Sequence, residues 1–407
     1  MRVLLTNNTL DVRAGSELYL RDVAIELMRR GHHPVAYSTK LGHVAAELRE
    51  ASVPVISRLD SMGEPPEIIH GHHHYETVTA MLRFPQTPAI YYCHGWAPWE
   101  EAPLCSPQIF RYVAVSDVCR ERLISEGGVA PGQIEILLNF FDERRFLPRA
   151  PLPDQPRLAC AFGPTFSEGG SFAILREACA SRGMEIHGVG FGSVDREADP
   201  GRLLAQYDIV FASGRAAIEA LAVGAAVILC SHTRIGPLVT AESFASLRKL
   251  NFALRALTRP LGPEAAVAEL RRYNAQDAAA VSALTRRHCE LQPAVDRLEA
   301  LYSEVVEAAG RISPAAALEA SRAAARYLEE WAGRYKGYDR IEAFRGIEEA
   351  LRGTEQQLEA MRASATWRWG QRTLGNPLVQ AIFGPLIRAT AERSSRRKRL
   401  PYRGSAA

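Results

Sequence analysis

This 407-residue sequence lacks several features that would place it in a particular protein class. Its seven cysteines have no C-x-x-C spacing, which argues against a cysteine zinc site and fits a reducing compartment. The longest uncharged apolar stretch, Ala220–Cys230, has about eleven residues, whereas a membrane-spanning helix needs about 20. Met1 leads almost directly into an apolar segment, so we expect no signal peptide and a cytoplasmic location.

Two nucleotide-binding signatures are also missing. No Walker A sequence occurs, and the glycine-rich His187–Gly192 stretch does not have the G-x-G-x-x-G spacing. A P-loop is therefore excluded, and NAD as a cofactor is not favoured.

What the sequence does contain is a compact βαβ pattern over Tyr207–Cys230. An apolar run at 209–211 ends at Ser213 and Gly214, a helix-forming run follows, and Gly224 stops it before a second apolar run. Ligands of open α/β sheets bind where strands end and helices begin, and helix N–H groups favour phosphate there. Ser213 and Gly214 are thus predicted to bind an anionic ligand.

The predicted helix after this turn carries only two charged residues, Arg215 and Glu219. Glu219 is the sole carboxylate among Ala, Ile, Leu and Val, so burial would require a partner. That partner is either Arg215, four residues earlier, or the hydroxyl groups of a ligand. We favour a ligand-binding Glu219, and Arg215 is a candidate phosphate clamp.

The pattern of strands alternating with helices predicts an α/β fold with parallel, doubly wound sheets. A proline-rich stretch at 148–156 divides it into an N-terminal Rossmann-like domain over residues 1–150 and a second one over 151–310. The predicted strands of the first domain are Val3–Thr6, Pro34–Ser38, Glu67–His70, Ala89–His94, Arg111–Ser116 and Ile134–Leu138. Ser16 is expected to cap a helix over Glu17–Arg30.

Polar residues gather at the carboxyl ends of the first domain's strands, where a ligand cleft is expected. Glu17, His72 and Asn139 are candidate cleft residues, and His94, followed by Gly95, is the candidate catalytic residue. A metal site among the consecutive histidines at 70–74 is not favoured, because neighbouring histidines in a loop do not converge on one ion.

The last hundred residues form a different region. A helical extension is predicted over residues 311–363, where heptad-like spacing fits pairing with a second copy or packing on the main body. A basic, amphipathic tail follows over 364–407. From Arg362 onward the chain has nine arginines, one lysine and one glutamate, a net +9 that leaves −6 for the rest. Its large apolar residues favour an anionic membrane surface over nucleic acid as a partner.

Four stretches together resemble the GT-B glycosyltransferases, especially family 4 of the retaining, nucleotide-sugar-dependent enzymes. The similar segments are AGSELYLRDVAIELMRRGHHPVAYS at 14–38, the strands IIHGHHH and YYCHG, the segment YVAVSDVCRERLISEGGVAPGQIEILLNFFDERRF at 112–146, and the helix of Glu219 followed by Gly224. HCELQPAVDRLEALYSEVV at 288–306 resembles the closing helix of the family. The match spans about residues 1–310.

The resemblance implies two Rossmann-like domains that face each other across a cleft. The second would bind a nucleotide sugar, with Glu219 on the ribose and the N–H groups around Gly15 and Ser16 on the diphosphate; His94 would lie near the transferred sugar. It implies that no metal is needed, and we expect no cofactor. We expect a glycan or lipid-linked acceptor, and the basic tail predicts a position on the inner face of a membrane. Pro164 and Glu168 stand where the family has cations. A non-catalytic nucleotide-sugar-binding or scaffold protein and a nucleotide-sugar epimerase therefore remain alternatives.

Overall fold

The computed structural model describes residues 1–96, 98–163, 166, 170–189, 199–310 and 312–332. By internal contacts the chain divides into a unit over Met1–Tyr327, which contains both sheets, and a unit over Leu328–Ala407. Pro164, Glu168 and the basic tail lie outside the described residues. Among the helices that are described, none is long and apolar enough to cross a membrane.

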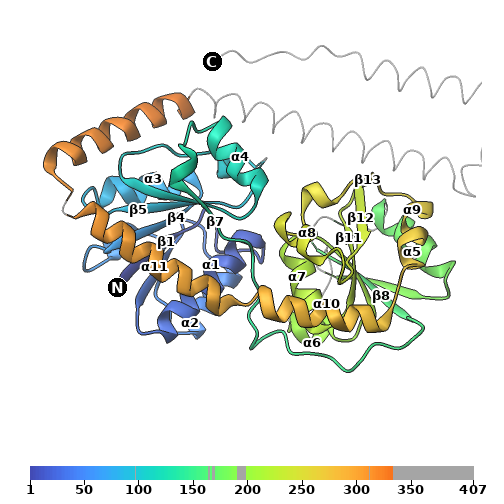
Figure 1. The fold of residues 1–407 in the computed structure, drawn as a ribbon. Helices are drawn as coiled ribbons and strands as arrows, with labels where there is room; N and C mark the ends of the chain where they lie inside the picture. Colours follow the sequence, from blue (N-terminus) through green and yellow to red (C-terminus); the bar gives the residue numbers. More distant parts are fainter. Residues whose placement is uncertain (97, 164–165, 167–169, 190–198, 311, 333–407) are drawn as a thin grey trace, which may run out of the picture. The chain divides into compact units, whose positions relative to one another are not determined.

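The first domain is built on a seven-stranded parallel sheet in the order β3-β2-β1-β4-β5-β6-β7 (Figure 1). Its strands are β1 (Arg2–Thr6), β2 (His33–Tyr37), β3 (Val55–Ile56), β4 (Ile68–His72), β5 (Ala89–Cys93), β6 (Ile109–Ala114) and β7 (Ile134–Ile136). Its helices are α1 (Gly15–Arg29), α2 (His43–Glu50), α3 (His74–Arg83) and α4 (Asp117–Ser125). The predicted doubly wound sheet is confirmed.

The direction of winding reverses between β1 and β4. The chain moves outward from β1 through β2 to β3, then returns to pair β4 with the other side of β1. Right-handed crossovers therefore place α1 and α2 on one face and α3 and α4 on the other. At such a switch point the loops that leave the two strands diverge, and a crevice opens at their carboxyl ends.

The second domain has a six-stranded sheet in the order β13-β12-β11-β10-β8-β9. Its strands are β8 (Leu158–Phe162), β9 (Glu185–Val189), β10 (Ile209–Ala212), β11 (Ala226–Cys230), β12 (Arg234–Leu238) and β13 (Arg259–Pro260). The helices are α5 (Ser171–Ala180), α6 (Pro200–Leu204), α7 (Arg215–Val223), α8 (Phe244–Lys249), α9 (Pro263–Leu270) and α10 (Ala275–His288). The first four strands in chain order are parallel to one another, and the switch point lies between β8 and β10. Strand β12 pairs antiparallel with β11, and β13 pairs antiparallel with β12.

The βαβ unit predicted from the sequence is the centre of this second domain. Every residue of β10 and β11 is buried, and Val210, Ile218 and Val227 lie in one apolar cluster. Gly224 ends α7 with a φ of 98°, the left-handed conformation that glycine adopts most easily at a helix end. The local glycine stop thus sets the length of α7 as the sequence predicts.

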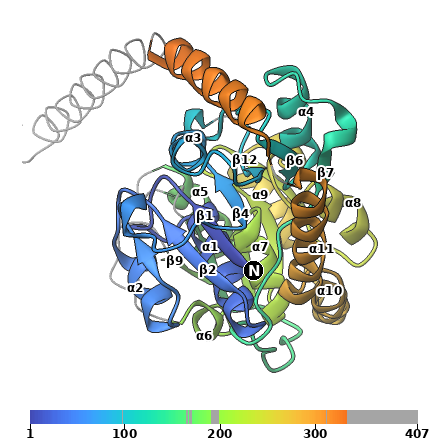
Figure 2. The same cartoon turned by 90° about the vertical axis from the view of Figure 1, so that its left-hand side faces the viewer.

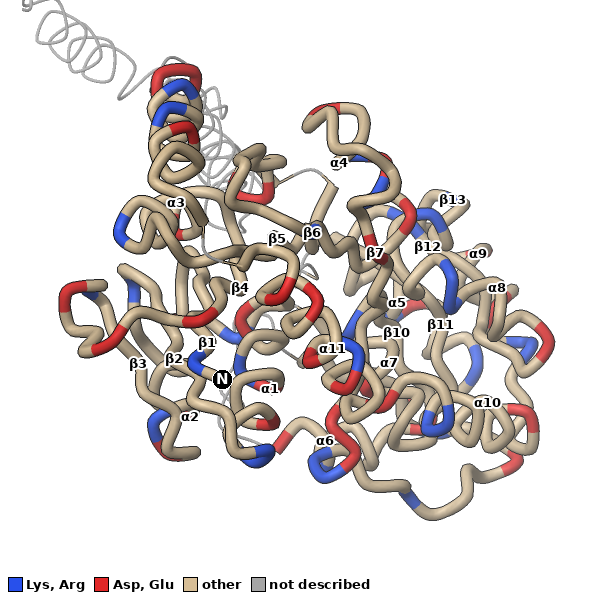
Figure 3. The backbone as a smooth tube through the Cα atoms, turned by 60° about the vertical axis from the view of Figure 1, so that its left-hand side comes forward, with Lys and Arg blue, Asp and Glu red and all other residues tan. Residues whose placement is uncertain are grey.

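After α10, helix α11 (Leu291–Ala309) returns to the first domain, where it contacts α1, β5 and β6 (Figure 2). Arg30, directly after α1, pairs with Asp296 and Glu299 of α11 at 2.6 Å each. Acidic and basic residues are interspersed over the described part of the chain (Figure 3). Residues 314–332 form a further helix, which lies within the predicted helical extension.

One expected boundary is wrong. Helix α1 begins at Gly15 rather than Glu17, so Ser16 lies inside its first turn and does not cap it. The residue before the helix is Ala14, and no side chain caps the α1 N-terminus. The residue before α1 therefore supplies no side-chain acceptor for the N–H groups of the first turn.

Candidate functional site

The switch point of the first sheet is lined by polar residues that follow β1 and β4. The Thr6 hydroxyl lies 3.1 Å from the N–H of His72 and 3.0 Å from its carbonyl oxygen, which ties the two strand ends together. The next residues out are also joined, because the N–H of Asn8 donates to Nδ1 of His73 at 3.2 Å. These contacts place Asn7, Asn8 and the histidines in one polar cluster.

His94 follows β5, the neighbour of β4, and its ring reaches back to that cluster. Nε2 of His94 lies 2.6 Å from Nδ1 of His72. Burial, with the nearby charges of His73, His70 and Arg215, holds the pKa of His94 well below its ordinary value. Burial likewise lowers the pKa of His72, so both rings are neutral at physiological pH.

Glu101 holds the main chain at His94. Its Oε2 accepts the N–H of His94 at 2.7 Å, and its side chain is 7% exposed. Burial raises the pKa of Glu101 to about 8, although the N–H groups of His94 and Gly95 lower it in part. The nearest basic ring nitrogen is Nε2 of His73, 3.7 Å from Oε1.

Aromatic rings link this cluster to the second domain. Tyr19 of α1 packs edge-on against His94, with ring centroids 4.9 Å apart, and against Phe140 at 4.8 Å. The guanidinium of Arg215 lies 5.7 Å from the Phe140 ring centroid. A continuous set of contacts therefore runs from His94 to the first turn of α7.

The predicted anion-binding turn of the first domain is open at its start. Gly15 is exposed, and no atom lies within 4 Å of where its Cβ would be. Ser16 donates its hydroxyl to Glu17 at 2.9 Å. Glu17 is 4% exposed, and burial raises its pKa. Glu17 thus lies beneath the turn rather than on its open side.

In the matching turn of the second domain, one N–H group is already hydrogen-bonded within the protein. Gly214 has a φ of 60°, and its N–H donates to the carbonyl of Phe252 at 2.8 Å. Ser213, half-buried, precedes it, and no side chain caps α7. Asn139 of the first domain lies near this turn. Its N–H donates to Oδ1 of Asn251, the residue before Phe252, at 3.1 Å.

Arg215 and Glu219 are both buried and bonded to each other. Nε of Arg215 donates to Oε1 of Glu219 at 2.8 Å. Of the two partners that the sequence allowed for Glu219, the structure therefore contains Arg215. Nη2 of Arg215 donates to Oδ2 of Asp22 on α1, a contact between the two domains. Burial raises the pKa of Glu219, and Arg215 offsets only part of that effect.

Asp22 is the centre of this network. Its side chain is 1% exposed, and Arg21 also donates to Oδ1 at 2.6 Å. Burial alone would raise the pKa of Asp22, but Arg21 and Arg215 more than offset this and hold the pKa below its ordinary value. Asp22 therefore remains ionised between two arginines.

Several polar atoms around the two switch points have no protein partner. Buried and unbonded among the described residues are Asn7 Nδ2, Asn8 Oδ1, His72 Nε2 and Arg215 Nη1. Buried polar atoms are normally satisfied, so a group of unsatisfied ones requires an explanation. Asn7 Nδ2, Asn8 Oδ1 and His72 Nε2 belong to the first domain and Arg215 Nη1 to the second, and all four are enclosed by protein.

The sequence missed the residues whose partners are far away in the chain. Asp22, Glu101 and Asn251 belong to the site through contacts with Arg215, His94 and Asn139. Asn7 and Asn8 could have been found, because two asparagines directly follow a buried strand. Trp96, two residues after His94, is 53% exposed and offers an aromatic surface beside the site.

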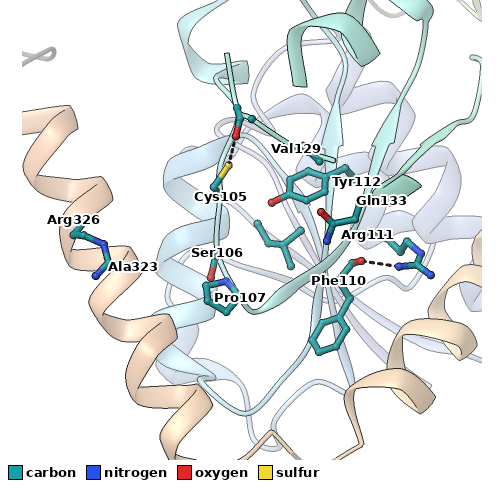
Figure 4. A pocket seen from close by; sticks show the side chains of 13 residues that line it. Cys105, Ser106, Pro107, Phe110, Arg111, Tyr112, Val129, Gln133, Ala323 and Arg326 are labelled. Carbon is teal, nitrogen blue, oxygen red and sulfur yellow. Dashed lines mark hydrogen bonds between the residues drawn. The ribbon is translucent and has the colours of Figure 1, made fainter. Parts of the chain in front are cut away.

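A separate cavity of about 640 Å³ lies at the amino end of β6 (Figure 4). It is lined by residues that include Cys105, Arg111, Tyr112 and Arg326. None of the predicted site residues lines it, and ligands of parallel sheets bind at the carboxyl ends of strands. Within the described residues, no group of three or more His, Cys, Asp or Glu has the arrangement of a metal site.

Comparison with known proteins agrees with this architecture. Residues 13–145 match the family model described as Glycosyltransferase Family 4. A glycosyltransferase from Rickettsia africae, 13% identical, gives a TM-score of 0.54 over 75% of this chain and 98% of that chain. Among the curated proteins, a search finds no match.

Two further solved structures have the same fold. Anabaena HepE in complex with UDP and glucose is 15% identical, with a TM-score of 0.52 over 75% of this chain and 100% of that chain. Sucrose-phosphate synthase from Thermosynechococcus elongatus is 12% identical, with a TM-score of 0.52 over 75% and 99%. The GT-B fold and the resemblance of the first domain to family 4 are confirmed.

We predict that Asp22→Asn destabilises the protein by about 3 kcal/mol, because it leaves Arg21 and Arg215 buried without their shared carboxylate. Thermal unfolding followed by circular dichroism measures the change. Asp60→Asn is the control, since Asp60 is 69% exposed and its ion pair with Arg58 should contribute less than about 0.5 kcal/mol. Equal melting temperatures for the two variants would contradict the prediction.

A second prediction concerns pH. Because the folded-state pKa of Glu101 is about 8, above the ordinary 4.5, this group favours folding fully below about pH 4.5, and its contribution is lost as pH rises through 8. Glu101→Gln removes that dependence, so the variant should gain melting temperature relative to the native protein between pH 5 and pH 9. Glu100→Gln, one position away, should follow the native profile; parallel profiles for all three proteins would exclude a buried, protonated Glu101.

Proposed function

We propose that this protein is a glycosyltransferase of hexosyl type, which moves a sugar from a nucleoside diphosphate donor to a cell-surface or envelope glycan or its lipid-linked precursor. In this reaction an acceptor hydroxyl bonds to the anomeric carbon, and the bond from that carbon to the diphosphate oxygen breaks. The diphosphate leaves with the electron pair, and the acceptor proton passes to it or to water. Retention of configuration is part of the proposal and follows the resemblance.

One observation carries the proposal. The helices that follow β1 and β10, α1 and α7, both lack a side-chain cap, and the Asp22–Arg215 ion pair joins them. Each of these strands borders a switch point of its sheet. Uncapped helix N-termini are suited to a diphosphate, because their N–H groups and dipoles offset its charge. Arg215, in the first turn of α7, is paired with both Asp22 and Glu219 and holds the two helix starts in place.

The proposed roles of the site residues follow from these positions. N–H groups at Gly15, Ser16 and Ser213 bind the donor phosphates, Gly214 shapes the turn while its own N–H is bonded to Phe252, and Arg215 and Glu219 complete the donor side. On the other side, His94 contacts the transferred sugar, with Asn139 around the acceptor and the buried His72 behind His94. Departure of the diphosphate is assisted by these N–H groups rather than by a metal ion. In the Anabaena HepE structure, UDP and glucose are bound within the same fold.

We also propose that the enzyme is cytoplasmic and peripheral on the inner membrane face through residues 364–407, with a second copy as a further partner of the extension. The apolar residues of the tail, together with its net positive charge, support this. Cosedimentation of the full chain with anionic vesicles tests it, and no difference from neutral vesicles would contradict it.

The function is tested with a panel of UDP-, GDP- and dTDP-sugars. We expect one donor to bind and to release its nucleoside diphosphate, faster in the presence of glycan acceptors. Binding without release would favour the non-catalytic alternative, and interconversion of sugar epimers without acceptor would favour an epimerase. If no donor binds, the proposal is wrong.

Glu219→Gln tests the donor side. Glutamine keeps an acceptor oxygen for Arg215 but removes the charge, so we expect donor affinity to fall about tenfold while the melting temperature changes by only a few degrees. Isothermal titration measures the affinity. An unchanged affinity would show that Glu219 serves only its ion pair.

A further inference from the structure

His72 and His94 are joined along their ring edges. Nδ1 of His72 lies 2.6 Å from Nε2 of His94, the ring centroids are 4.8 Å apart, and the ring planes differ by 18°. Nearly coplanar rings with facing nitrogens have the geometry of an N–H···N hydrogen bond in the ring plane. One of the two nitrogens must therefore carry the proton of this bond.

The surroundings of His72 fix its orientation. Its main chain is held on both sides by the Thr6 hydroxyl. The His72 ring is fully buried and stacks on His70, with centroids 4.5 Å apart and planes 16° apart. Tyr19 and Tyr92 pack around it at 5.7 and 5.2 Å. The His72 ring thus has a set position, whereas His94 is only partly buried and is the ring that a ligand can reach.

The other nitrogen of His72 decides which way the bond points. Nε2 of His72 is buried and has no partner. If His94 donated the proton, a neutral His72 would carry its own proton on Nε2, as a buried N–H without an acceptor. If His72 donates, Nε2 is an unprotonated acceptor without a donor. Orphaned buried N–H groups are rarer than under-satisfied acceptors, which favours donation by His72.

We propose that His72 is a positioning residue that donates Nδ1–H to Nε2 of His94 and so fixes the tautomer of His94. With Nε2 engaged as an acceptor, neutral His94 carries its proton on Nδ1 and offers an N–H to an oxygen of the bound sugar donor. His94 is therefore a hydrogen-bond donor at the reacting sugar and not a base. The ligand half of this inference rests on the proposed function, whereas the tautomer does not.

The tautomer is measured directly on the full chain labelled with ¹⁵N-histidine. Long-range proton–nitrogen correlations distinguish protonated from bare ring nitrogens, and a His94→Gln variant assigns the signals. At pH 7 we expect His94 to be protonated on Nδ1 and bare on Nε2. A proton on Nε2 of His94 would overturn the inference, whether or not the protein turns over any donor.

Three substitutions of His72 test the effect on turnover with the donor that the panel identifies. His72→Asn places an amide N–H near the Nδ1 position, His72→Gln places it near Nε2, and His72→Leu has none. We expect kcat to fall about 10- to 100-fold in the Leu and Gln variants and only a few-fold in Asn, with smaller changes in KM. The melting temperature of each variant is the control for folding.

An equal fall of kcat in the His72→Asn and His72→Gln variants would overturn the positioning role. Full activity of either the His72→Leu or the His72→Gln variant would also overturn it. If the Leu variant does not fold, the comparison of Asn with Gln and the nitrogen signals of His94 in both still decide the matter. In the Asn variant the Nδ1-protonated tautomer should persist, and in the Gln variant it should be lost.

Discussion

The buried ion pair of Arg215 with Asp22 is the constraint on which the arrangement of the site depends. A guanidinium and a carboxylate can be buried together only if each is neutralised and hydrogen-bonded. Arg215 lies in the first turn of α7 and Asp22 at the start of the third turn of α1, so this requirement brings the helices of two domains into contact. Arg21 and Glu219 complete the neutralisation. The uncapped N-termini of α1 and α7 are thereby held in fixed positions relative to each other.

The sequence predicted those parts of the fold that local chemistry determines. The short, apolar run Ala226–Cys230 between a glycine and a polar residue favours a buried strand, and Gly224 after an apolar helical run favours a helix end. The start of α1 was predicted two residues late, because a serine that could cap a helix was preferred over a glycine that begins it. The return of α11 to the first domain was not predictable, since an amphipathic helix shows which face it buries but not against which sheet.

Only part of the candidate site follows from the sequence, for the same reason. Strand ends identify His72, His94 and the turn at Ser213, because the carboxyl edge of a parallel sheet is where ligands bind. Ion pairs and hydrogen bonds between residues far apart in the chain could not be predicted in this way. Asp22 lies 193 positions from Arg215, and Glu101 reaches the main chain of His94 from a separate turn. A polar site residue can be predicted from the sequence only when it lies at a recognisable position, such as the end of a strand.

These pairings also bear on how an anion would be held. Two carboxylates already neutralise Arg215, and the histidines around His94 are uncharged, so the described site carries little free positive charge. Its remaining donors are neutral: the first-turn N–H groups at the exposed Gly15 and a ring N–H of the partly buried His94. Gly214 contributes less, since its N–H is bonded to Phe252. Under the proposed function, a diphosphate would therefore be bound by oriented dipoles more than by net charge, and short-range dipoles discriminate by position where a diffuse positive field would not.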